Sequence, residues 1–343
     1  MPFSCSAFGN EDISQLPLLW QQSIIDNARE EAERALAQRR LKTLSFSIVT
    51  ALVAGVVARP AAVQATDYKD TITGVADNDR AGGTGNYSPG YDIAGQDGVQ
   101  HYRFADGDSV AREGVDGDVR AMSITSGNPP VVLDVAGDGW LELSAIRGES
   151  STVGSAVGIL NDGNTVTVNG NTRISTNADD LDFGMVRGSS AQGVLGRGRS
   201  TTVFNGATDI HARTQGFARA VWADRTSTII FNGPTTILAE SRGTLDAVYS
   251  FDGRITFNGN TTISALSIWP SDNAHAIYND GVGSRMTVNG DLSLTTVAMG
   301  STAFGVRTQG TMEVTGDTTV DVKGPRSTHG IASWHWRSRM TWN

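Results

Sequence analysis

Serine, histidine and carboxylate side chains are the groups in this sequence that could carry out chemistry. Ser109 follows a glycine and an aspartate in the tetrapeptide GDSV, where a serine could act as a nucleophile. A nucleophilic serine needs a neighbouring base and an oxyanion hole. No Asp-x-x-His pair follows Ser109, and residues 66–343 lack the helical patterns of an α/β scaffold. We therefore predict no catalytic residue.

The histidines and one acidic segment are the candidates for metal ligands. The five histidines are His101, His211, His275, His329 and His335. None belongs to a His-Glu-x-x-His motif, and we interpret His329 and His335 as exposed positions of one coil. Asp179, Asp180 and Asp182 offer the oxygen ligands that calcium prefers, but their spacing is not that of an EF-hand. The sequence predicts a solvated loop there, no metal site and no cofactor.

The charge balance and the cysteine content exclude further classes. The formal net charge is -9 at pH 7, and an acidic surface repels phosphate backbones, so we predict no nucleic-acid partner. The single cysteine is Cys5, which precedes a predicted export signal. The exported chain would therefore contain no disulfide and no cysteine-based zinc site.

Residues 39–65 have the pattern of a secretory signal peptide. Two arginines and a lysine precede the uncharged apolar stretch 44–57, and small residues follow near Ala65. A transmembrane helix needs ~20 apolar residues, so this stretch is short for a retained anchor. We predict cleavage between Ala65 and Thr66.

Residues 1–38 precede this signal, and their nature stays open. Residues 15–38 have the apolar periodicity of an amphipathic helix and carry many acidic side chains. They are either a helical N-terminal extension or the product of a start codon assigned too far upstream.

A repeated Asn-Gly or Thr-Gly turn gives the clearest structural signal. It recurs in segments such as VTVNGNTRIS, ITFNGNTTISA and MTVNGDLSLTT. The glycines of these turns are Gly170, Gly206, Gly233, Gly259, Gly290 and Gly316. A second block with small residues, such as AVGILNDG from Ala156 and AHAIYNDG from Ala274, precedes each turn. Two blocks in fixed order indicate one repeated structural unit.

The alternation of side chains within each copy predicts which residues are buried. Successive residues of a strand point to opposite faces, so the residue just before the turn and the fifth residue after its Asn lie inside. The predicted core columns are Phe204, Phe231 and Phe257, and Ile174, Ile210, Ile237, Ile263, Leu294 and Val320. The predicted ladder of turn amides is Asn169, Asn205, Asn232, Asn258 and Asn289.

These patterns favour an all-β parallel β-helix. One coil cannot bury its own apolar face, so neighbouring coils must stack. The alternative is a β-propeller, whose blades of ~40–50 residues are too long for most of these repeats. We assign the repeats to residues 131–343 and an irregular N-terminal cap to residues 66–130.

At this point the chain resembles the passenger regions of bacterial autotransporters, the type V secreted surface proteins. The resemblance covers residues 40–343 and is strongest from Ala156 onward, with AHAIYNDG and RITFNGNTTISA as the matching repeats. It implies a right-handed β-helix that is displayed on the outer membrane or released from it. It also implies a role in adhesion, aggregation or another interaction with a host or bacterial surface ligand.

The family carries a C-terminal translocator barrel, which is the partner that the resemblance implies. No segment with the alternation of barrel strands precedes Asn343. We expect a truncated gene, a fragment, or a barrel that lies elsewhere. The protein would be exported through the inner membrane and would reach the cell surface if a barrel is supplied, and would otherwise stay in the periplasm.

Two other functions stay open beside adhesion. β-Helix enzymes that degrade polysaccharides place carboxylates and arginines on the outer face of consecutive coils. Arg173 and Asp209 are outward in the predicted register, but Thr236 and Thr262 interrupt that row. Paired acid/base chemistry has no visible position there, so we predict no enzyme. The remaining alternative is a non-functional remnant of a truncated gene.

Overall fold

The fold is all-β in every part of the chain that the structure describes. The computed structural model describes residues 67–68, 93–94, 99–104, 106–114, 117–126, 129–148, 154–178, 189–267, 273–299, 302–332 and 340–342. Each element in these ranges is a β-strand, so the predicted all-β class is confirmed. Within these ranges no helix has the length and apolarity needed to cross a membrane.

The strands form three sheets within one compact unit, Ala65–Asn343. The nine-stranded sheet contains, in spatial order, β2 (Ile93–Ala94), β3 (Gln100–Phe104), β6 (Val131–Val135), β9 (Thr165–Asn169), β12 (Thr201–Phe204), β15 (Thr228–Phe231), β18 (Arg254–Phe257), β21 (Arg285–Val288) and β24 (Thr311–Val314). The ten-stranded sheet contains β1 (Asp67–Tyr68), β4 (Ser109–Gly114), β7 (Trp140–Arg147), β10 (Asn171–Ala178), β13 (Thr208–Thr214), β16 (Thr235–Ser241), β19 (Thr261–Ser267), β22 (Leu292–Ala298), β25 (Thr318–Lys323) and β27 (Met340–Trp342). The eight-stranded sheet contains β5 (Val119–Thr125), β8 (Ser155–Asp162), β11 (Ser190–Arg197), β14 (Phe217–Asp224), β17 (Leu245–Phe251), β20 (Ala274–Asp280), β23 (Thr302–Thr308) and β26 (Arg326–Ala332).

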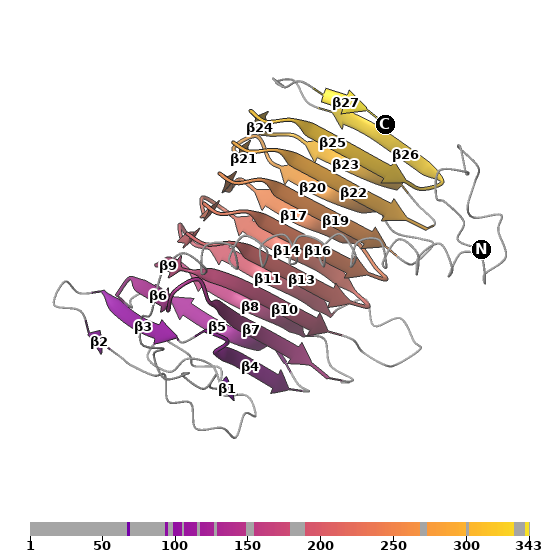
Figure 1. The fold of residues 1–343 in the computed structure, drawn as a ribbon. Coiled ribbons are helices and arrows are strands. Elements are labelled where there is room, and N and C mark those ends of the chain that lie inside the picture. The colour runs from indigo at the N-terminus through magenta and orange to yellow at the C-terminus, as the bar shows by residue number, and fades with distance from the viewer. Residues whose placement is uncertain are drawn as a thin grey trace, which may run out of the picture. The chain divides into compact units, whose positions relative to one another are not determined.

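The chain runs from the nine-stranded to the ten-stranded to the eight-stranded sheet and then repeats the circuit. Described strands that neighbour each other pair in parallel, apart from the antiparallel pair β2–β3. Figure 1 shows these coils stacked from β4 in indigo to β26 in yellow. The parallel β-helix is therefore confirmed and the propeller is excluded, while the handedness of the coil stays a prediction.

The predicted irregular cap over residues 66–130 is wrong for part of that range. β3, β4 and β5 pair in parallel with β6, β7 and β8, so they form a coil of the solenoid. The first coil therefore starts at Gln100 rather than at Val131. Its corner after β3 contains Gly107 with a φ of 79° and has no Asn-Gly turn. A search for the turn motif could not find this coil.

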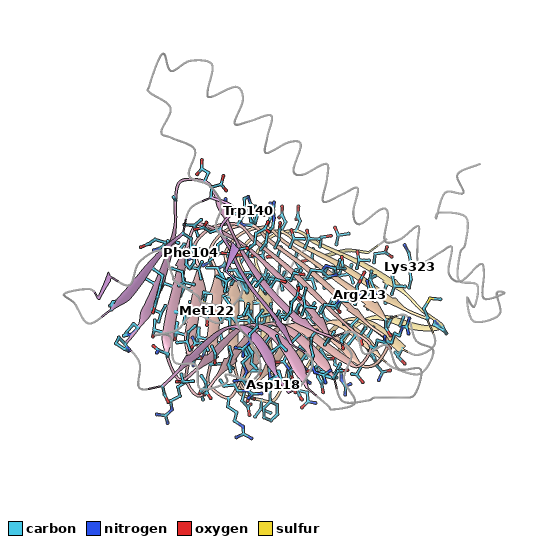
Figure 2. All side chains as sticks on the ribbon, turned by 90° about the horizontal axis from the view of Figure 1, so that it is seen from below. Phe104, Asp118, Met122, Trp140, Arg213 and Lys323 are labelled. Atoms are coloured by element: carbon cyan, nitrogen blue, oxygen red, sulfur yellow. The ribbon has the colours of Figure 1, made fainter. Side chains whose placement is uncertain are left out.

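Large apolar side chains from the nine- and ten-stranded sheets fill the interior. The rings of Phe204, Phe231 and Phe257 stack with centroids 5.0 Å apart and planes 6° apart. Further along each coil the ten-stranded sheet contributes buried side chains, which are Ile174, Ile210, Ile237, Ile263, Leu294 and Val320. In Figure 2 the fully buried Met122 lies inside the solenoid and the exposed Asp118 lies at its edge. Each coil thus continues one apolar core.

Small residues of the second block make room for these side chains. A Cβ added at Gly193 would lie 2.3 Å from Cγ2 of Ile210, and one at Gly158 would lie equally close to Cγ2 of Ile174. Ala220 takes the next place in this row with no exposed surface. The eight-stranded sheet therefore keeps small residues opposite the isoleucine column because the interior is close-packed.

The turn residues hold neighbouring coils together at one corner. A Cβ at Gly233 would lie 2.3 Å from the backbone oxygen of Gly206, so the backbones are too close for a side chain. Beside this corner the asparagine amides form a continuous ladder. The Nδ2 atoms of Asn205, Asn232, Asn258 and Asn289 each donate to Oδ1 of the preceding asparagine over 2.6–2.7 Å. Asn169 starts the ladder and donates to Asp134 over 2.8 Å.

We predict that replacing one ladder asparagine destabilises the protein modestly. Asn232→Ala removes one donated and one accepted amide bond, and we expect a loss of about 1–2 kcal/mol because each bond contributes about 1 kcal/mol net. Asn232→Asp should cost at least as much, since a carboxylate cannot donate to Asn205. Urea denaturation measures both, and unchanged midpoints would contradict a stabilising ladder.

Several predictions fall outside the described residues. They concern the extension over residues 1–38, the signal over residues 39–65 with its cleavage between Ala65 and Thr66, the loop with Asp179, Asp180 and Asp182, and His335. The backbone of His329 lies in β26, but its side chain is outside the described part.

Candidate binding surface

The outer face of the eight-stranded sheet differs from the other two outer faces. Outward side chains of the nine- and ten-stranded sheets are mostly half-buried or exposed. On the eight-stranded sheet Val157, Leu160 and Leu195 point outward and yet expose only 2%, 5% and 2% of their surface. They form an apolar cluster apart from the interior core, and the half-buried Trp222 packs against it. This outer face therefore has apolar packing of its own.

An aromatic column continues this cluster along the solenoid. Trp222, Tyr249 and Tyr278 occupy equivalent positions of β14, β17 and β20. The ring centroids are 5.9 Å apart for the first pair and 5.4 Å apart for the second, and both contacts are edge-to-face. Edge-to-face contact is a favourable arrangement for aromatic pairs, so the column is a stable part of the sheet.

A charged cluster lies beside the aromatic column on the same three strands. Nε of Arg219 donates to Oδ2 of Asp246 over 3.3 Å. Nδ1 of His275 is 2.7 Å from Oδ1 of Asp246, and because a carboxylate oxygen accepts, the imidazole donates through Nδ1. The side chains of Asp246 and His275 are each 3% exposed. One carboxylate thus fixes both a guanidinium and an imidazole in a shielded position.

Cation–π contacts connect the two rows. The guanidinium carbon of Arg219 lies 3.6 Å from the ring centroid of Tyr249 and 4.3 Å from that of Trp222. Arg197 lies 5.5 Å from the Trp222 ring and Arg307 lies 4.7 Å from the Tyr278 ring. Such contacts contribute about 0.5–2 kcal/mol each, depending on exposure. Arginines therefore lie along the column from one end to the other.

Burial sets the protonation of this surface. It raises the pKa of Tyr249 above its usual range; Arg219 opposes this shift and Asp280, which accepts the phenol over 3.1 Å, adds to it. Burial also raises the pKa of Tyr278, with Asp280 acting in the same direction. For Arg219, burial lowers the pKa and Asp246 counteracts it. Both phenols therefore stay protonated near neutral pH and can donate hydrogen bonds.

Three shielded polar atoms on this face have no hydrogen-bond partner in the described structure. They are Oε1 of Gln192, Nε1 of Trp222 and Nε2 of His275. Gln192 and Trp222 lie on the neighbouring strands β11 and β14, and the other amide atom of Gln192 donates to Ser190. A buried polar atom without a partner costs about 1–3 kcal/mol. Clustering of three such atoms on one face is typical of a surface that meets a ligand.

The residues considered from the sequence lie elsewhere. Ser109 begins β4 in the ten-stranded sheet, between β1 and β7. Arg173 and Asp209 point outward on that sheet, as the register predicts, at an Nε–Oδ2 distance of 3.8 Å. Arg173 also donates to Glu142 over 3.1 Å and lies 4.2 Å from the Trp140 ring centroid. Of the described histidines, His275 alone belongs to the cluster on the eight-stranded sheet.

Sequence reasoning missed the cluster, although a signal was present. The second block places Trp222, Tyr249 and Tyr278 directly after the inward Val or Ile of each copy. Correct alignment starts the third copy at Leu245, which pairs with Ala218, instead of at Ala247. In that alignment the aromatic residues form one column and the charged residues another.

The cluster can bind and orient polar groups, but it lacks the pair of open carboxylates that glycoside hydrolysis uses. Both oxygens of Asp246 are engaged by Arg219 and His275. In the described part of the chain no three His, Cys, Asp or Glu side chains gather to hold a metal ion. Models of protein families, curated proteins and solved structures were compared with the chain, and none matches it.

Proposed function

We propose that this protein is the passenger region of an autotransporter-like surface protein and that it acts by binding, as an adhesin. The observation that carries the proposal is the outer face of the eight-stranded sheet, where an aromatic column and the Arg219–Asp246–His275 cluster lie side by side. Aromatic side chains with a few fixed polar groups are typical of binding sites. The solenoid repeats this surface along its coils, which suits contact with an extended ligand.

The export pattern over residues 39–65 supports a location outside the inner membrane. We expect the full chain, expressed in a Gram-negative host, to lose its first 65 residues and to begin at Thr66. Intact-mass measurement of the exported protein tests this prediction. A retained N-terminus in the periplasmic fraction would contradict it, and Ala65→Leu, which removes the small residue that signal peptidase reads, serves as the uncleaved control.

Surface display is tested by adding the partner that the family implies. We expect the full chain, fused after Asn343 to a translocator barrel, to become accessible to external protease on intact cells. Cells that display it should attach to surfaces or to one another more than cells that carry the barrel alone. A fusion that stays protected from protease, or one that is displayed without any increase in attachment, would contradict the proposal.

A further inference from the structure

We propose that the outer face of the eight-stranded sheet binds an uncharged saccharide chain laid across β11, β14, β17, β20 and β23. The inference rests on the proposed function, because it names the ligand class of the same surface. Three features of the face carry it: ring surfaces, unpartnered polar atoms and balanced charge.

Ring surfaces are available on three consecutive strands. Trp222, Tyr278 and Phe304 are half-buried, so part of each ring remains open to a ligand. His275 continues this surface, with its ring centroid 4.8 Å from that of Phe304 and 5.0 Å from that of Tyr278. The C–H face of a pyranose ring is apolar and packs on such rings, while its hydroxyls remain free for polar contacts. Neighbouring strands are ~4.8 Å apart, so successive rings can contact successive parts of one chain.

The unpartnered atoms match hydroxyl groups better than any group with one hydrogen-bonding role. Oε1 of Gln192 accepts, and Nε1 of Trp222 donates. Since His275 donates through Nδ1 to Asp246, its Nε2 is an acceptor in the neutral imidazole. A hydroxyl can both donate and accept, so one kind of ligand group can partner all three. Gln192 and His275 expose only 5% and 3% of their surface, so their positions are fixed before binding.

The balance of charge favours an uncharged ligand over a polyanion. The charged side chains of this part of the sheet are Arg197, Arg219 and Arg307 and, opposing them, Asp224, Asp246 and Asp280. The chain as a whole has a formal net charge of -9, which repels polyanions at long range. Mixed acidic and basic groups instead accept from and donate to hydroxyls without a net charge requirement.

Affinity electrophoresis of the full chain tests the proposal. The native gels contain soluble β-glucan, xyloglucan or mannan, and alginate serves as the acidic contrast. We expect at least one neutral polysaccharide to retard the protein. Tyr278→Leu and Arg307→Gln, which disrupt one cation–π pair on the face, should each weaken the retardation about tenfold. Arg173→Gln removes a similar pair on the ten-stranded sheet and should leave retardation unchanged.

Far-UV circular dichroism of each variant separates loss of binding from loss of folding. Retardation by none of the three neutral polysaccharides, retardation by alginate alone, or an equal loss in Arg173→Gln would each overturn the proposal. The purified chain is tested without display, so a failure here leaves the adhesin proposal standing. Conversely, failure of display and attachment on cells would leave saccharide binding by the purified chain intact.

Discussion

Phe231→Ala should lower the free energy of unfolding by about 3–5 kcal/mol, because it removes the middle ring of a fully buried stack. Phe231 contacts Phe204 on one side and Phe257 on the other, each with ring centroids 5.0 Å apart. Neighbouring coils cannot close the resulting cavity, since the turn glycines already hold their backbones at the closest approach. The loss should therefore lie near the upper end of this range.

Urea denaturation measures the total effect, and hydrogen exchange locates it. We expect exchange to rise in β12, β15 and β18, because each coil of a solenoid contacts only its neighbours. The matched control is Ile230→Ala, which changes the adjacent, half-buried outward residue of the same strand. This control should cost roughly 1 kcal/mol or less. Equal losses for the two variants would contradict the assigned register.

Asp246→Ala should cost about 3–5 kcal/mol, as expected when one partner of a buried ion pair is removed. The change leaves the guanidinium of Arg219, 14% exposed, and the imidazole of His275, 3% exposed, without their shared acceptor. A buried donor that loses its acceptor cannot recover the bond from water. The outer face of the eight-stranded sheet should therefore lose order around β14, β17 and β20.

An exposed ion pair on another sheet gives the control for this variant. Glu142→Ala removes a partner of Arg173, but the two side chains are 49% and 33% exposed. Exposed ion pairs contribute about 0–1 kcal/mol, so this variant should stay close to the parent protein. Thermal or urea unfolding distinguishes the two, and a loss of under 1 kcal/mol for Asp246→Ala would show that the cluster is not a stabilising element.

The sequence was sufficient for the interior because the interior obeys a simple period. Phe204, Phe231 and Phe257 precede the same turn in three copies, and alternation along a strand then determines their direction. The turn glycines were equally visible, although the reason for them was not. Only the structure shows that a Cβ at Gly233 would meet the backbone of Gly206.

The first coil and the outer cluster could not be found by the same route. β3, β4 and β5 have strand alternation, but a different corner joins β3 to β4, so the motif that marks later coils is missing. The Arg219–Asp246–His275 cluster combines three residue types in one column. A search for repeated identity passes over such a column, because complementary charges need different residues at equivalent positions. Burial of these side chains is a property of the folded face and has no sequence pattern of its own.

The central claim is that a solenoid built from these repeats works by binding through the outer face of its eight-stranded sheet. The most direct measurement is the attachment of cells that display the chain through a translocator barrel, compared among the parent, Tyr278→Leu and Arg173→Gln at equal surface levels. The account predicts that attachment falls about tenfold for Tyr278→Leu and is unchanged for Arg173→Gln. Equal attachment of all three would contradict it.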